Sequence, residues 1–292
     1  MLPFKYMAMT NLIKPTIIIP PIKCQGIKTK LVPFITDNIK WNGKGRWIEP
    51  FMGSCVVPLN VQPMHAMLAD NNEILVQLYQ EFQSTETTSS EVKSYLEFWG
   101  NKLLCEGDSV YYRIRDRFNH DPNTLDFIFL NRTCFNGLIR FNKKGEFNTP
   151  FGRNAGKLSV KYIEKIVDQV VQCKQVLANT QWKFKHQDWR ITLDSVTPDD
   201  FVYIDPPYTG RNATYYGQWS LDDMDCLIEV VKALPCSWAM STWLSYGEQR
   251  NGYIVDNFID YEILSYDHFY RVGSFTEYRN TVEEGLILSH DA

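Results

Sequence analysis

Phe201-Val202-Tyr203-Ile204-Asp205-Pro206-Pro207-Tyr208 is the stretch of this 292-residue sequence that decides its fold. The first four residues form an apolar run, which is typical of a strand buried inside a parallel sheet. The run ends abruptly at an aspartate and two prolines, and proline has no N–H to donate to a strand ladder. We therefore expect Asp205 at the carboxyl end of a strand, where open α/β proteins bind their ligands.

Other segments alternate between short strands and helices. Strands are expected at 46–49, 66–69 and 237–240, and a helix at about 72–82, where apolar residues recur at helical spacing. Strands that alternate with helices favour an α/β sheet whose strands are joined by crossovers.

The middle of the chain has a different character. It is polar and mostly helical, and residues 131–145 are rich in Asn and Gly, which predicts a β-hairpin or a turn-rich loop. The sequence therefore predicts a loosely ordered tail at 1–16, a catalytic domain built from 17–83 and 159–292, and a recognition insert at 84–158.

Composition narrows the class of protein. No apolar run reaches the roughly 20 residues of a membrane span, so we expect a cytoplasmic protein that does not enter membranes. The seven cysteines form no CxxC pair, which disfavours a disulfide framework or a zinc site, and we expect no metal. The net charge of −4 argues against a basic surface all round. It leaves room for DNA binding, since phosphate contacts need only a local basic face.

The Asp205–Tyr208 tetrapeptide suits the activation of an amine on a nucleobase. Such an amine is a poor nucleophile, because its lone pair is delocalised into the ring. Two acceptors for its hydrogens, the Asp205 carboxylate and the Pro206 carbonyl, would favour the pyramidal form that can attack a methyl group. Tyr208 would stack on a base that has been flipped out of a duplex. The alternative is a strand-terminating turn with a capping aspartate.

A second constellation combines the loop Glu49–Cys55 with Asp70. A glycine loop after a first strand lets a ligand approach the backbone closely, and an acidic residue after the next strand can hold ribose hydroxyls. The loop lacks a phosphate-binding lysine, so a nucleoside without phosphates fits better than a nucleotide. Taken alone, the pattern is equally compatible with a plain strand–turn–helix.

Together these motifs resemble the Dam-like (D12 class) DNA adenine-N6 methyltransferases. The resemblance rests on Lys23-Cys24-Gln25-Gly26-Ile27-Lys28, the Glu49–Cys55 loop, Asp70, the long Asn131–Gly152 signature and the Asp205–Tyr208 tetrapeptide. It covers nearly the whole chain after residue 17. Residues 20–23, 207–211, 241–243 and 268–273 are most similar to the EcoRV-type modification enzymes, which methylate adenine in GATATC.

The resemblance implies a fold, ligands and site residues. The fold would be a Rossmann-like S-adenosylmethionine-dependent methyltransferase sheet with an inserted, mostly helical target-recognition domain that carries a β-hairpin. Its partner would be double-stranded DNA, and we expect a nucleoid-associated monomer. The implied catalytic residues are Asp205, Pro206 and Tyr208. The implied S-adenosylmethionine-binding residues are Cys24, Lys28, Glu49, Phe51, Gly53, Ser54, Asp70, Asp188 and Trp189. The implied DNA-binding residues are Lys23, Arg115, Phe135, Asn136, Arg140, Asn148 and Arg153.

One departure from the family pattern concerns Cys55, which stands where the family has a second loop glycine. A side chain at that position could crowd the cofactor, or, if the loop needs a positive φ there, a cysteine would be strained. Three alternative functions stay open from the residues alone: methylation of the N4 amine of cytosine, methylation of adenine in RNA, and DNA binding without catalysis. The recognition insert favours adenine in duplex DNA.

Overall fold

The computed structural model describes residues 16–208, 219–269 and 281–292. The tail predicted at 1–16 lies almost wholly outside the described residues, as do 209–211 and 270–273 of the resemblance. Among the described residues, no helix is long and apolar enough to cross a membrane.

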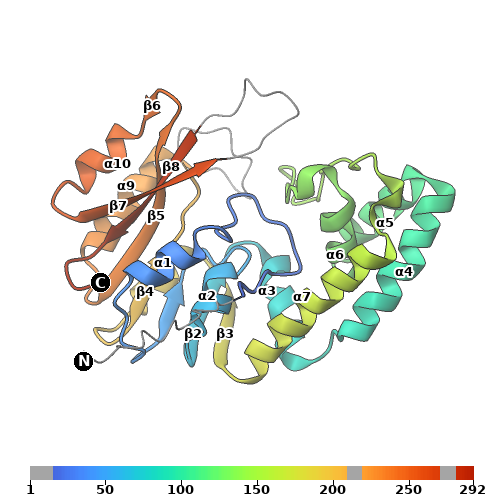
Figure 1. Ribbon diagram of the computed structural model, residues 1–292, viewed down its shortest axis with the longest axis horizontal. Helices are drawn as coiled ribbons and strands as arrows, with labels where there is room; N and C mark the ends of the chain where they lie inside the picture. Colours follow the sequence, from blue (N-terminus) through green and yellow to red (C-terminus); the bar gives the residue numbers. More distant parts are fainter. Residues whose placement is uncertain (1–15, 209–218, 270–280) are drawn as a thin grey trace, which may run out of the picture.

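A mixed sheet forms the centre of the molecule (Figure 1). The spatial order is β3-β2-β1-β4-β5-β8-β7, with the short β6 paired to β5. Neighbouring strands from β3 to β5 run parallel, whereas β8 is antiparallel to both β5 and β7. The strands are β1 (Trp47–Glu49), β2 (His65–Asp70), β3 (Gln181–His186), β4 (Phe201–Ile204), β5 (Ser237–Tyr246), β6 (Gln249–Arg250), β7 (Glu262–Phe269) and β8 (Thr281–Leu288).

The predicted alternation of strands and helices is therefore confirmed, and β4 ends directly before Asp205 as its apolar run predicted. The central strands are buried on both faces. Alternate residues of β4 belong to two separate cores, with Phe201 and Tyr203 on one side and Val202 and Ile204 on the other. This two-sided burial is why the strand sequence is apolar throughout rather than alternating.

Helices cover both faces of the sheet. One core packs against α1 (Val32–Asn38), α2 (Val56–Val61), α3 (Glu73–Ser84) and α7 (Val160–Ala178). The other packs against α8 (Trp189–Asp194), α9 (Leu221–Lys232) and α10 (Gly252–Asn257). The predicted helix at 72–82 corresponds to α3, whose buried residues include Ile74, Leu78 and Phe82.

A helical unit lies beside the sheet, on the right in Figure 1. It consists of α4 (Ser89–Glu106), α5 (Asp108–His120) and α6 (Thr124–Thr133), followed by two short 3-10 turns, η1 (Phe135–Gly137) and η2 (Ala155–Lys157). A capping box between Thr88 and Glu91 starts α4 at the end of the Ser/Thr-rich stretch. Helix α7 packs along α4 and also along α3, so it joins this unit to the sheet.

The predicted hairpin takes the form of a turn-rich loop. Two isolated antiparallel bridges, Cys134 with Phe151 and Phe141 with Phe147, hold it together instead of a strand ladder. Gly145 donates its N–H to the Asn142 carbonyl at 2.9 Å, which closes the tip. Glycine and asparagine residues here favour tight turns over extended pairing.

Candidate active site

A cavity of about 260 Å³ opens at the carboxyl ends of β1, β2 and β4. All nine residues predicted to bind the cofactor line it, although they come from four separate segments of the chain: Cys24, Lys28, Glu49, Phe51, Gly53, Ser54, Asp70, Asp188 and Trp189. Asp205 and Pro206 line the same cavity. The structure therefore brings the predicted cofactor residues and the predicted catalytic carboxylate into one space.

Asp205 is held by a buried lysine. The Lys28 Nζ lies 2.8 Å from Oδ1 of Asp205 and donates a hydrogen bond to the Gly26 carbonyl at 3.0 Å. Burial raises the pKa of Asp205 above its ordinary value, and the Lys28 cation offsets part of that rise. The ammonium group thus favours the ionised form of a carboxyl group in a place that disfavours charge.

Tyr208 completes this corner of the site. Its ring centre lies 4.9 Å from the Lys28 Nζ, a cation–π distance. Its hydroxyl donates to Oε2 of Glu284 on β8 at 2.6 Å. Burial, together with the charges of Asp205 and Glu284, raises the pKa of Tyr208 well above its ordinary value. The phenol is therefore a donor at neutral pH.

The glycine loop is braced by Asp70 at the end of β2. One carboxylate oxygen of Asp70 accepts the Gly53 N–H and the other accepts the Asn72 N–H, both at 2.9 Å. Among the described residues, no atom lies within 4 Å of the place a Cβ on Gly53 would take. Its φ of +46° also suits glycine. The loop leaves its backbone open to a ligand at Gly53.

Cys55 adopts the strained conformation that the sequence suggested. Its φ is 56° and its ψ 20°, in the left-handed region, and its side chain is fully buried. Left-handed backbone costs a residue with a Cβ about 1–2 kcal/mol. The family's glycine avoids that cost, whereas this chain tolerates it inside a packed core.

Glu49 is a buried residue of the cavity lining. The Trp47 indole Nε1 donates to its Oε1 at 2.8 Å. Burial is the main cause that raises the pKa of Glu49 well above its ordinary value, and the Trp47 hydrogen bond opposes the rise. A cationic ligand in the cavity would favour the ionised form of this carboxyl.

An aromatic wall forms part of the cavity lining. The rings of Phe51, Trp189 and Trp219 lie within 6.2 Å of one another, centre to centre. Faces of this kind suit a flat heterocycle such as adenine. Trp219 comes from the segment before α9, and the sequence pattern had not singled it out.

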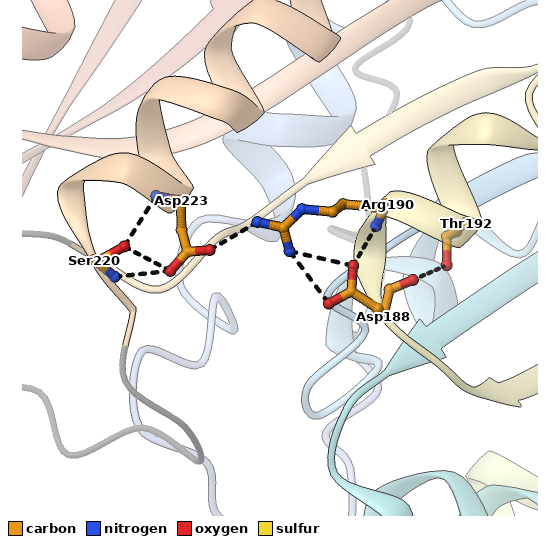
Figure 2. A network of polar contacts seen from close by, with 5 residues as sticks. All are labelled: Asp188, Arg190, Thr192, Ser220 and Asp223. Carbon is orange, nitrogen blue, oxygen red and sulfur yellow. Dashed lines mark hydrogen bonds and ion pairs between the residues drawn. The ribbon is translucent and has the colours of Figure 1, made fainter.

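An ion-pair network ties this wall together (Figure 2). Figure 2 shows Arg190 lying between Asp188 and Asp223, with its Nη2 2.8 Å from Oδ1 of Asp223 and its Nη1 3.3 Å from Oδ2 of Asp188. The guanidinium also lies 4.4 Å from the centre of the Trp189 ring. Hydrogen bonds from Arg190 and Ser220 lower the pKa of Asp223. Arg190 thus links the first turns of α8 and α9.

The charges around the cavity indicate which ligand it suits. Five carboxylates and two cations line it among the described residues: Glu49, Asp70, Asp188, Asp205 and Asp223 against Lys28 and Arg190. A phosphate would meet this excess of negative charge unfavourably, whereas a ligand with hydroxyls and a positive centre would be favoured. No group of three or more His, Cys, Asp or Glu residues in the described part of the chain could hold a metal ion.

The predicted DNA-binding residues lie outside this cavity. Asn131 clamps the backbone of Lys23, accepting its N–H at 2.7 Å and donating to its carbonyl at 2.8 Å. The Lys23 side chain then packs on Gly137, because a Cβ there would lie 2.5 Å from its Cδ. The structure thus brings Lys23, from the N-terminal segment, against the turn-rich loop of residues 134–151, here called the recognition loop.

Arg140 is oriented by another predicted residue, Asn148. The Arg140 Nε donates to Oδ1 of Asn148 at 2.8 Å, and its Nη2 donates to the Asn148 carbonyl at 3.2 Å. Phe135 is half exposed on the same loop, and Asn136 and Arg153 both have positive φ.

Arg115 lies on helix α5, outside the loop that carries Arg140. Its guanidinium stacks over the Tyr112 ring at 4.8 Å, and it lines a second hollow of about 420 Å³ together with Asn148.

Four residues of the site were missed by the sequence patterns: Arg190, Trp219, Asp223 and Glu284. No sequence motif distinguished Arg190 or Asp223, because exposed charged residues are common at the starts of helices. Glu284 carried a weak sequence signal, since it comes shortly before the apolar end of β8, and the structure shows that it is only 1% exposed. A buried carboxylate is costly unless something pairs with it.

Comparison with known proteins identifies the family of this chain. Residues 25–272 match the D12 class N6 adenine-specific DNA methyltransferases. This chain belongs to that family. The predicted family and its methyltransferase fold are confirmed, and the family implies S-adenosylmethionine as the methyl donor and DNA as the substrate.

Individual relatives agree with the match for this D12 class chain. It is 31% identical over 227 residues to the Type II methyltransferase M.MjaIII of Methanocaldococcus jannaschii, covering 70% of this chain and 76% of that protein. It is 30% identical over 218 residues to the DNA adenine methylase of Escherichia coli (strain K12), covering 69% and 72%. It is 29% identical over 210 residues to the Retron Ec67 DNA adenine methylase of Escherichia coli, covering 69% and 68%.

Proposed function

We propose that this chain transfers a methyl group from S-adenosylmethionine to the N6 amine of adenine in duplex DNA, at GATATC or a related site that contains GAT. The observation that carries the proposal is the shared cavity. Asp205 and Pro206 lie at one side of it and the nine predicted cofactor residues surround the rest. The methyl donor and the acceptor amine would therefore meet in one cavity, without a conformational change that brings two distant sites together.

The residues of the cavity fit the proposed cofactor. Asp70 would accept from ribose hydroxyls with the lone pairs that its two backbone hydrogen bonds leave over. Phe51, Trp189 and Trp219 would enclose the adenine ring, and Glu49 would attract the positive end of the molecule. When bound, S-adenosylmethionine supplies a methyl group already activated by a sulfonium.

The chain's own groups would prepare the target amine. A flipped adenine would stack on Tyr208 and present its two N6 hydrogens to the Asp205 carboxylate and the Pro206 carbonyl. Hydrogen bonds to both would localise the nitrogen lone pair toward the cofactor side. The Lys28 ammonium keeps Asp205 ionised and therefore able to accept. The proton that the nitrogen loses after transfer leaves toward the same carboxylate.

The recognition loop would read the DNA from the major groove. Lysine and arginine donate to O6 and N7 of guanine there. Lys23 and Arg140 are held by Asn131 and Asn148 in defined positions, as base readers need to be. Phe135, Asn136, Arg115 and Arg153 would add contacts to the flanking duplex. The insert boundaries at 84 and 158, the monomeric state and the nucleoid association stay predictions.

The test is a methyl-transfer assay with isotopically labelled S-adenosylmethionine on unmethylated duplex DNA, on single-stranded DNA and on RNA. The products are digested to nucleosides and separated. We expect label in N6-methyladenosine from duplex DNA. Label in N4-methylcytosine, or label from RNA alone, would replace the proposed substrate. Cofactor binding without any transfer would indicate a binding protein. Sequencing of the methylated positions tests GATATC separately.

A further inference from the structure

Glu284 is a buried carboxylate that the proposed chemistry does not use. It lies on β8, is 1% exposed, and accepts the Tyr208 hydroxyl at 2.6 Å. A carboxylate in such a place is expensive unless it is hydrogen-bonded. Its position beside Tyr208, close to Asp205, indicates a role within the site.

The sheet is irregular at the point where Glu284 sits. Trp243 of β5 pairs with Glu284 and Ser245 pairs with Glu283, so Leu244 is an extra residue in β5. Such bulges re-aim side chains next to active sites. Gly285 makes room for this bulge, because a Cβ there would lie 2.8 Å from the Leu244 side chain.

Asn251 stabilises the irregular strand. Its side-chain amide donates to the Trp243 carbonyl at 2.9 Å, and its backbone N–H donates to the Leu244 carbonyl at 2.8 Å. Asn251 is itself buried. The two carbonyls at the bulge are therefore hydrogen-bonded, which stabilises the part of the sheet that carries Glu284.

Tyr208 is consequently held at both ends. Its ring faces the Lys28 ammonium and its hydroxyl is anchored on β8. A tyrosine has two side-chain torsions, and a hydrogen bond at the far end of the ring restricts both. The hydroxyl stays protonated, since burial and the two nearby carboxylates raise its pKa well above the ordinary value.

We propose that Glu284 is a positioning residue, which holds the Tyr208 ring in the orientation in which it stacks on the target adenine. This inference rests on the proposed function. Glu284 would act through its hydrogen bond with the Tyr208 hydroxyl, so its effect is expected in the chemical step and not in cofactor binding.

The experiment is a double-mutant cycle with Glu284→Leu and Tyr208→Phe. The readouts are kcat on unmethylated duplex genomic DNA, the Kd for S-adenosylmethionine by calorimetry and the thermal midpoint. A hydrogen bond to a charged group is worth about 1.5–3 kcal/mol, so we expect each single variant to lose about 10- to 100-fold in kcat. The double variant loses no more than either single variant. Glu284→Gln, whose amide oxygen still accepts, recovers most of the activity.

Glu283→Gln is the matched control. Glu283 is the neighbouring carboxylate, half-buried and bonded to Ser245 Oγ at 3.0 Å, and its change should leave kcat within a few-fold of the parent. Additive losses in the double variant would overturn the inference, as would Glu284→Gln being as poor as Glu284→Leu. If Glu284→Leu does not fold, Tyr208→Phe and Glu284→Gln still test the inference. A kcat for Tyr208→Phe equal to that of the parent would overturn it. Absence of transfer by the parent would instead overturn the proposed function.

Discussion

The ammonium nitrogen of Lys28 lies 2.8 Å from a carboxylate oxygen of Asp205, and the lysine side chain is 4% exposed. The pair joins the loop before α1 to the residue that follows β4. A buried ion pair of this kind contributes little net stability, although removal of one partner leaves an uncompensated charge. Its electrostatic effect falls on Asp205, because the Lys28 cation lowers the pKa of this carboxyl against the rise that burial causes.

Replacement of Asp205 should separate catalysis from cofactor binding. We expect Asp205→Asn and Asp205→Ala to lose at least about 100-fold in kcat, the lower end of general acid–base effects. The Kd for S-adenosylmethionine should stay within a few-fold, since Asp70, Glu49 and the aromatic wall are untouched. Single-turnover transfer and calorimetry measure the two quantities. Activity near the parental value would contradict the mechanism.

Lys28→Met should change the pH dependence of kcat. The Lys28 cation lowers the pKa of Asp205, whereas burial raises it. Loss of the cation therefore raises this pKa further. Because only ionised Asp205 accepts from the amine, the acid limb of the kcat profile moves to higher pH. Lys28→Arg keeps the charge and serves as the control. An acid limb that does not move would show that Lys28 has no electrostatic role.

Asp70→Ala should weaken cofactor binding. Asp70 braces Gly53 and is the proposed ribose partner, and charged hydrogen bonds are each worth about 1.5–3 kcal/mol. We expect a rise of roughly 10- to 100-fold in the Kd for S-adenosylmethionine, measured by calorimetry. Asp194→Ala, at the exposed end of α8, is the control. An unchanged Kd would show that Asp70 only holds the backbone of the glycine loop and does not contact the cofactor.

Cys55→Val should destabilise the fold more than the same change at another buried cysteine. A β-branched residue is a genuine outlier at a φ of 56°, and such strain costs about 1–3 kcal/mol. Cys173 lies buried in helix α7, where valine fits the backbone, so Cys173→Val is the matched control. Urea unfolding gives both free energies. Equal losses for the two variants would mean that the left-handed backbone at Cys55 is unimportant.

Arg140→Ala should relax discrimination at one guanine. A bidentate arginine–guanine contact is worth about 1–3 kcal/mol of discrimination. Asn148→Ala should relax the same position to a smaller extent, because Asn148 orients the guanidinium. Methylation of duplexes substituted at each site position, at two salt concentrations, measures this, with the exposed Lys144→Ala as control. A uniform loss on every duplex with a salt slope lower by about one would assign Arg140 to a phosphate.

The recognition loop shows where prediction from sequence was weaker. The long signature contained Arg140 and Asn148, and the separate segment Lys23–Lys28 contained Lys23. Neither indicated that Asn131 clamps Lys23 or that Asn148 turns toward Arg140. The expected hairpin is held by isolated bridges rather than strands. Asn and Gly predict turns well, because their preference is local. The partners of a side chain depend on segments that the turn brings together.

The sequence by itself determined the strand that ends at Asp205, the glycine loop with its strained Cys55, and the family. These features depend on neighbouring residues: an apolar run stopped by two prolines, and a side chain where the backbone requires a positive φ. Only the tertiary structure decided that Lys28 pairs with Asp205, that Arg190 joins Asp188 to Asp223, and that Glu284 anchors Tyr208. The physical reason is that parallel strands end at one edge of the sheet, so residues far apart in the chain meet there, and no local pattern specifies which of them will touch.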